Sequence, residues 1–452
     1  MLELLYEALN NSEHGEELTK LHKQGVELLQ RFERFGHVTS LEKATAMLSK
    51  AVAFTPLSSP DRPRQLNSLG NSYAFRFQRF EEMKDIDLAI EQHCEAVAST
   101  PLDSAELPGF LSNLGNSYMC RFQRFGEPKD IDLAIKHQLE AIASTPLDSA
   151  ERPGRLNYLG TSYRRRFEKF GGVVKDIDSA IEQQLNAVAS TPLDGTEVPG
   201  FLNDLGYSYM LRFQRLGEAK DIDLAIERQR KAVASILPNN ADLPGYLNSL
   251  GNSYMCRYQQ FGDVKDLDLA IEQQLNAVVS TSLYGADAPG FLNDLGNSYR
   301  SRFQRFGDVK DIDSAIKHQL NAVVSSSLDG AYVPGFLNDL GNSYRSRFQR
   351  FGEVKDIDSA IEHQLTAVAS MPLDSADVPG FLNDLGNSYM LRFQRNDIAT
   401  TDTRRATESL CPNCYLTSSY FEVFYNSIWL LLLVTSTHPP QQLLLKNVNR
   451  PH

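Results

Sequence analysis

Asparagine recurs along this chain at two positions that could bind the backbone of an extended peptide. Both lie beside a recurring Leu-Gly dipeptide, one two residues before the leucine and the other directly after the glycine. An amide side chain both donates and accepts hydrogen bonds, so a row of amides can hold successive peptide units without reading much sequence. The candidate binding residues are Asn67, Asn71, Asn116, Asn157, Asn203, Asn248, Asn252, Asn293, Asn297, Asn338, Asn342, Asn383 and Asn387.

These asparagines have a second interpretation that involves no ligand. The two positions are four residues apart, so on a helix they share one face. Each amide could instead hydrogen-bond the helix ends or loops of the next unit and so set the register in which units stack. A residue that recurs once per unit serves either purpose, and the sequence leaves both alternatives open.

A second set of residues is ionic. Pairs of arginines recur before a short turn, and pairs of aspartates recur after it. A row of arginines could bind phosphate or carboxylate groups, but we favour ion pairs within each unit, because every arginine has an acid nearby. Exposed pairs of this kind contribute roughly 0–1 kcal/mol each. The residues are Arg212, Arg215, Arg302, Arg305, Arg347 and Arg350, with Asp221, Asp223, Asp311, Asp313, Asp356 and Asp358.

Signals for catalysis or metal binding are weak. His137, His318 and His363 share one phase of the repeat, with His93 one residue off it, and their neighbours are typical of a solvated helix face. Cys411 and Cys414 have CxxC spacing, but no second pair accompanies them. We therefore predict no catalytic residue, no metal ligand and no cofactor, and we expect that the chain is not an enzyme.

The elements that position these residues follow from the period of Leu-Gly. From Leu69-Gly70 to Leu385-Gly386 the interval is 45 residues, with one step of 46. A fixed period of this size is typical of a solenoid, in which each unit is too small to fold alone. Residues 291–306 carry apolar side chains three and four apart, which predicts a first helix, and Gly307 suits its C-terminal cap.

A second helix is predicted to begin at Asp311 as its N-cap and to pack antiparallel to the first. Gly296 lies in the middle of the first helix, where glycine costs roughly 0.5–1 kcal/mol relative to alanine. Its recurrence indicates that the neighbouring helix leaves no room for a Cβ atom.

The units extend over most of the chain. A degenerate unit surrounds Gly25, and the last helix, residues 379–395, has no partner. We therefore predict an all-α solenoid of eight helix pairs plus one unpaired first helix. It occupies residues 17–395, between an N-terminal extension (1–16) and a poorly ordered tail (396–452). The tail contains an apolar run, Ile428 to Val434, that is too short to span a membrane.

Composition narrows the choice of partner. The net charge is −12, so nucleic acid and anionic membranes are predicted not to be partners. The first twenty residues lack the pattern of a secretory signal. Three of the five cysteines, Cys94, Cys120 and Cys256, lie in the repeats and are interpreted as buried thiols in a reducing compartment, which favours a cytoplasmic location.

The unit resembles tetratricopeptide (TPR) repeats. Leu114-Gly115 followed by Tyr118 matches the first helix of that family, and Ala134, Ala141 and Pro146 match the second. Gln138 replaces the family's aromatic residue, and the period exceeds the usual 34. The extended unit is also similar to kinesin light chain repeats and to fungal arrays that accompany CHAT caspase-like domains.

This resemblance implies a right-handed solenoid whose first helices line a concave surface, with the asparagines facing the groove. It further implies a non-catalytic scaffold that binds a protein or an extended peptide segment. The alternative is a regulatory or sensing arm of a CHAT-type peptidase whose catalytic domain is missing from this chain.

Overall fold

The computed structural model describes residues 2–171, 174–192, 195–281, 285, 287–326, 332–371, 375 and 377–408. Within these residues every regular element is an α-helix, and there are seventeen of them. Contacts between residues divide the chain into two units, Met1–Ile236 and Leu237–His452. The two units are described separately below.

The first unit contains five helix pairs. Its helices are α1 (Leu2–Phe35), α2 (Val38–Phe54), α3 (Arg62–Phe80), α4 (Met83–Ala98), α5 (Leu107–Phe125), α6 (Pro128–Ala143), α7 (Arg152–Phe170), α8 (Val174–Ser190), α9 (Val198–Leu216) and α10 (Ala219–Ser235).

The second unit contains three pairs and a further first helix. Its helices are α11 (Leu243–Phe261), α12 (Val264–Ser280), α13 (Ala288–Phe306), α14 (Val309–Ser325), α15 (Val333–Phe351), α16 (Val354–Ala369) and α17 (Val378–Glu408). The predicted eight pairs plus one first helix are confirmed in the described part of the chain.

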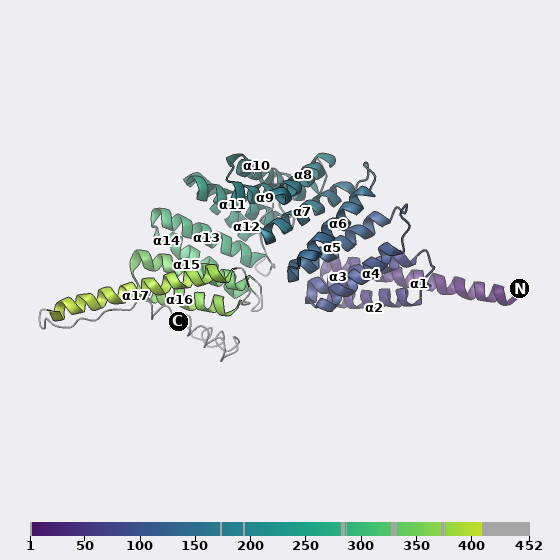
Figure 1. The fold of residues 1–452 in the computed structure, drawn as a ribbon, viewed down its shortest axis with the longest axis horizontal. Coiled ribbons are helices and arrows are strands. Elements are labelled where there is room, and N and C mark those ends of the chain that lie inside the picture. The colour runs from purple at the N-terminus through teal and green to yellow at the C-terminus, as the bar shows by residue number, and fades with distance from the viewer. Residues whose placement is uncertain are drawn as a thin grey trace. The chain divides into compact units, whose positions relative to one another are not determined.

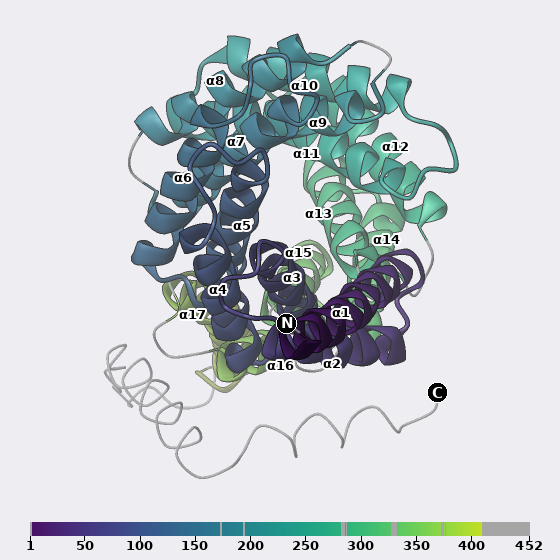
Figure 2. The same ribbon diagram turned by 90° about the vertical axis from the view of Figure 1, so that its right-hand side faces the viewer.

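Within each unit the helices form two layers. Each odd-numbered first helix packs against the second helix of its own pair, and that second helix packs against the first helix of the next pair. Consecutive first helices also contact one another, as α13 and α15 do, so that they form one row with the second helices on its outer side (Figures 1 and 2). We call the contact between two consecutive first helices a junction.

Helix ends follow from local residue chemistry. The first helix of most pairs has proline in its first turn, where the missing N–H is tolerated. Gly307 ends α13 with φ of 77° and donates its backbone N–H to the Phe303 carbonyl over 2.7 Å. Glycine adopts this left-handed conformation without steric cost.

The predicted N-cap of the second helix was wrong by three residues. Helix α14 begins at Val309, and its N-cap is Asp308, whose Oδ1 accepts a hydrogen bond from the Lys310 N–H over 3.0 Å. Asp308 and Asp311 are both good capping residues, and the sequence does not distinguish them. Asp311 is instead buried inside the first turn of α14.

The recurring glycines are required for close packing, as predicted. A Cβ atom built on Gly296 would lie 2.6 Å from Gln319 Cγ and 3.1 Å from the Ala315 carbonyl oxygen. The second helix therefore lies directly against the backbone of the first, beside a core that includes the fully buried Ile312 and Ala315.

The predicted domain limits at residues 16 and 395 each fall inside one continuous helix, α1 and α17 respectively. The tail beyond Glu408, including Cys411, Cys414 and Ile428 to Val434, lies outside the described residues. Among the described helices, none combines the length and the hydrophobicity that a membrane-spanning segment needs.

Candidate functional site: the junctions between first helices

The asparagines of the second unit hydrogen-bond an aspartate on the next first helix. At the α13–α15 junction, Asn293 and Asn297 donate to Asp339 Oδ2 over 2.8 and 2.9 Å. The α11–α13 and α15–α17 junctions repeat the arrangement, with Asn248 and Asn252 on Asp294, and Asn338 and Asn342 on Asp384. Two amides from one repeat therefore hold one carboxylate of the following repeat.

A buried glutamine extends this network to the second helix. Gln319 of α14 donates to Asn297 Oδ1 over 2.9 Å and accepts from the Ser343 hydroxyl of α15 over 2.6 Å. Its side chain is 0% exposed, beneath the close-packed Gly296. One glutamine thus ties three helices together through both ends of its amide.

These contacts bear on the two interpretations of the asparagines. Asn248, Asn293 and Asn338 are only 6–8% exposed, and their Oδ1 atoms are buried without a hydrogen-bond partner. A buried acceptor cannot meet a ligand, whereas the Nδ2 atoms already bridge repeats. For these residues the geometry favours the interpretation in which asparagine sets the stacking register.

Asn383 and Asn387 of α17 differ from the others. No first helix follows α17 in the described part of the chain, and neither side chain forms a hydrogen bond with another described residue. Asn383 is exposed and Asn387 is half-buried. This pair can therefore report on ligand binding separately from stacking.

The first unit uses the same positions with other partners. Asn67 accepts from Asn113 over 3.0 Å, because Asn113 stands where the second unit has aspartate. Asn157 donates to Asp204 over 2.8 Å. Asn116 Oδ1 lies 3.4 Å from its donor, Gln138, and Asn203 Oδ1 is buried without a partner among the described residues.

His93 replaces the buried glutamine at the α3–α5 junction. Its Nε2 lies 3.1 Å from Asn71 Oδ1 and its Nδ1 lies 2.9 Å from the Ser117 hydroxyl. A neutral ring with the proton on Nε2 reproduces the donor and acceptor of the amide. Burial lowers the pKa of His93 to about 4, which keeps the ring neutral at pH 7.

The pKa values of two junction aspartates, Asp294 and Asp384, shift in opposite directions. Burial raises the pKa of Asp294, although Asn252 and Asn248 oppose the shift. Burial also acts on Asp384, but the bonds from Asn342 and Asn338, together with the charge of Arg345, lower its pKa. Arg345 lies 3.1 Å from Asp384 Oδ1. An added arginine therefore stabilises the ionised junction.

The arginines at the end of each first helix fall into two classes. Arg302 pairs with Asp311 of its own unit over 2.7 Å, as predicted, and Arg212 and Arg347 pair with Asp221 and Asp356 in the same way. The second aspartate was assigned incorrectly, because Asp313 pairs with Arg347 of the following unit over 3.0 Å. These ion pairs therefore link consecutive repeats as well as the two helices of one repeat.

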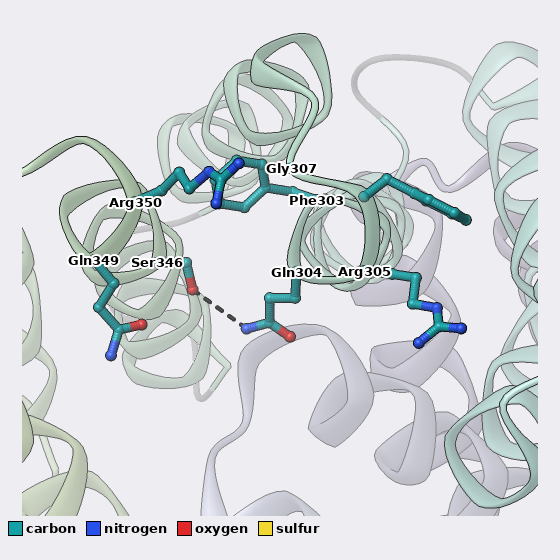
Figure 3. Close-up of a pocket in the computed structure, with 8 residues that line it drawn as sticks. Phe303, Gln304, Arg305, Gly307, Ser346, Gln349 and Arg350 are labelled. Carbon is teal, nitrogen blue, oxygen red and sulfur yellow. Dashed lines mark hydrogen bonds between the residues drawn. The ribbon is translucent and has the colours of Figure 1, made fainter.

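The second arginine of each pair does not bind these aspartates. We call Arg79, Arg124, Lys169, Arg215, Arg305, Arg350 and Arg395 the terminal basic residues. Arg305 and Arg350 are exposed, and neither forms an ion pair with another described residue. They line a pocket of about 440 Å³ at the α13–α15 junction, together with Gln304, Gln349 and Ser346. Arg350 reaches toward Gly307, and Gln304 donates to Ser346 over 3.3 Å (Figure 3).

Comparisons with known proteins concern the fold. No protein-family model matches the sequence, and no curated protein matches it. The human IFIT1 dimer with m7Gppp-AAAA is a similar solved structure (16% identity, TM-score 0.49, covering 84% of this chain and 72% of that one). Nearly identical TPR-like repeats of a putative kinesin light chain from Podosopora anserina are similar over 48% of this chain and 97% of theirs (13% identity, TM-score 0.36). A thermophilic TPR protein from Thermus thermophilus covers 52% and 98%, respectively (17% identity, TM-score 0.36).

The repeats are TPR-like. Antiparallel helix pairs stack through a close-packed glycine on the first helix and small residues on the second, where the sequence placed them. The association with a CHAT-type peptidase is not tested by these comparisons and stays a prediction. The same holds for the exclusion of nucleic acid as a partner.

The histidines of the TPR-like repeats do not lie on a solvated face. His318 and His363 are half-buried and stack on Tyr299 and Tyr344, with ring centroids 5.8 and 5.6 Å apart. Burial lowers the pKa of both histidines. Among the described residues, no group of three His, Cys, Asp or Glu side chains could hold a metal ion. Cys94, Cys120 and Cys256 are half-buried, and none of them forms a disulfide with another described residue.

Proposed function

We propose that this chain is a non-catalytic scaffold that binds an extended segment of another protein along its first helices. One observation carries the proposal. The buried polar groups of the junctions link consecutive repeats, and a glutamine followed by an arginine recurs near the end of most first helices from α3 onward, with Glu168-Lys169 in α7 and Gln259-Gln260 in α11 as the exceptions. At the α13–α15 junction these are Gln304, Arg305, Gln349 and Arg350.

An array of this kind suits an extended ligand better than a small molecule. Each junction offers only a few exposed polar side chains, but similar side chains recur in successive repeats. A peptide segment that lies along the first helices therefore makes several weak contacts with one chain. Linked weak contacts of this kind add to give useful affinity. The asparagines contribute chiefly by keeping these groups in register.

A direct test is selection of a random peptide library on the full chain, followed by calorimetry of the enriched peptides. We expect saturable binding of extended peptides that share a recognisable composition. Failure to enrich any peptide would overturn the proposal, and so would saturable binding of a single-stranded RNA in place of every peptide.

A direct role for the asparagines in binding can be tested separately. Asn383→Ala and Asn387→Ala remove side-chain amides that bond no described residue, so they should leave the melting temperature unchanged. If the asparagines also bind the peptide, this double variant loses affinity. Unchanged affinity would show that these two asparagines do not bind the peptide.

A further inference from the structure

The terminal basic residues have a partner at one junction of the first unit. Arg124 Nη2 lies 2.8 Å from a carboxylate oxygen of Glu81, and both side chains are about half exposed. Glu81 is the residue that follows α3, at the position where Gly307 follows α13. The ion pair therefore shows how a carboxylate can bind one of the terminal basic residues.

Glu81 holds this position at a conformational cost. It is the only residue other than glycine with positive φ (57°) in the described part of the chain. Glutamate in the left-handed region is strained, whereas glycine is not. At the other C-caps, Gly126, Gly171, Gly217, Gly262, Gly307 and Gly352 have positive φ without a side chain.

At the α13–α15 junction, Gly307 occupies the position of Glu81, so no side chain of the C-cap residue extends toward the next first helix. A Cβ atom built on Gly307 would lie 3.3 Å from Arg350 Nη2, so a side chain placed as Glu81 is would meet a guanidinium that has no ion pair with another described residue. The next junction repeats the arrangement, with Arg395 Nη2 3.7 Å from a Cβ built on Gly352. In each case the arginine already lies over the C-terminal end of a helix, whose partial negative charge favours it there.

We propose that Arg305, Arg350 and Arg395 bind the carboxylates of an acidic, extended peptide segment, which supplies from outside the group that Glu81 supplies within the chain. The inference rests on the scaffold function proposed above and names the chemistry of its partner. The amides of Gln304 and Gln349 in the same pocket provide donors for a second carboxylate oxygen or a backbone carbonyl.

The surroundings favour carboxylates over a nucleic acid. Asp308 and Glu353 follow Gly307 and Gly352 directly and are exposed. A phosphate backbone carries a charge at every nucleotide, so it would meet these acids as well as the arginines. A peptide can place glutamate at the arginines and neutral residues between them.

The probe for the test is a short fluorescein-labelled peptide in which glutamate alternates with glycine. Fluorescence anisotropy would measure its binding to the full chain and to the triple variant Arg305→Gln, Arg350→Gln and Arg395→Gln. The matched control is Lys310→Gln, Lys317→Gln and Lys355→Gln, which removes the same charge from exposed positions on second helices. A peptide with glutamine in place of glutamate controls for composition.

We expect the arginine variant to bind the acidic peptide about tenfold more weakly, the product of two- to threefold losses at three exposed charge contacts. The lysine variant should change affinity less than twofold, and added salt should weaken wild-type binding. All three proteins should have the same melting temperature.

Equal loss in both variants would overturn the inference, because it would reduce the effect to net charge. Preference of the wild type for the glutamine peptide would overturn it while leaving the scaffold function intact. Tighter, arginine-dependent binding of an oligoadenylate RNA would also overturn it. If no peptide of any composition binds, the scaffold function itself fails.

Discussion

The α3–α5 and α13–α15 junctions share one backbone plan and differ in several side chains, including three at the polar contacts and the C-cap. Asn113, His93 and Glu81 in the first unit stand where Asp339, Gln319 and Gly307 stand in the second. At α3–α5, Asn113 and His93 hydrogen-bond asparagines of α3, and Glu81 forms an ion pair with Arg124. At α13–α15 a carboxylate binds two amides, and Arg350 remains free of ion pairs with described residues.

Under the proposed function, stacking and ligand binding use separate residues. The interior of both junctions is filled by a bridging side chain, so the repeats stack in either case. The exposed end differs as well: the chain supplies a carboxylate at α3–α5, whereas the pocket at α13–α15 lacks one. Substitutions can therefore alter one property and leave the other.

The largest expected effect is loss of the junction carboxylate. Asp339→Ala removes the acceptor of Asn293 and Asn297 and the partner of Arg300, so it should lower the free energy of unfolding by roughly 3–4 kcal/mol. Asn113→Ala, the matched change at α3–α5, breaks one amide–amide bond and should cost about 1 kcal/mol. Thermal melting followed by circular dichroism distinguishes them, and equal shifts would contradict the difference drawn between the junctions.

The bridging residue gives the α3–α5 junction a pH dependence that α13–α15 lacks. The pKa of His93 is about 4 in the folded protein against 6.5 unfolded, so the unfolded chain binds the proton first as pH falls. Stability should therefore drop between pH 6.5 and 4, by roughly 3 kcal/mol in all, and stay lowered below that.

His93→Gln restores the residue found at α13–α15 and should remove this component. The measurement is the melting temperature of both proteins at pH 7.5 and at pH 4.5. A wild type that loses no more stability than His93→Gln on acidification would show that the buried ring does not titrate as described.

The bridging residues also predict how each junction tolerates a methyl group on its glycine. A Cβ on Gly70 would lie 2.4 Å from His93 Nε2, on a rigid ring, whereas on Gly296 it meets the flexible Gln319 at 2.6 Å. We expect Gly70→Ala to cost about 2–3 kcal/mol and Gly296→Ala about 1–2 kcal/mol. Gly290→Ala is the control, because nothing lies within 4 Å of its Cβ. Denaturant unfolding measures the three, and a Gly290→Ala cost equal to the others would refute close packing as the cause.

The smallest effect is expected at the exposed end. Glu81→Gly relieves a positive φ and removes one exposed ion pair, so the two changes nearly cancel and stability should shift by less than about 1 kcal/mol. The same variant frees Arg124, and binding of the acidic peptide should increase. Unchanged peptide binding, measured by anisotropy, would show that Arg124 does not belong to the carboxylate-binding row.

The sequence predicted the fold better than the site. The 45-residue period and the apolar stripe predicted the helix pairs, and the mid-helix Gly296 predicted their close approach. Both predictions succeeded because each depends only on residues within one unit. The partners of Asn293 and of Asp313 lie in the next repeat, and the register between repeats is set by packing that one unit does not reveal.

Two features of the candidate site are present in the sequence but ambiguous there. Gln319 recurs at the same position in most second helices, but a polar residue there is interpreted as solvated until the glycine above it is placed. The two arginines of each pair look alike in sequence, and only the geometry separates the paired Arg302 from the free Arg305.

The central claim is that α13–α15 accepts from a partner the carboxylate that α3–α5 carries itself. Gly307→Glu tests it most directly, with Gly307→Gln as a control of equal size and backbone cost. If the claim holds, the glutamate occupies Arg350, and acidic-peptide affinity measured by anisotropy falls about threefold below that of Gly307→Gln. Equal affinity of the two variants would contradict it.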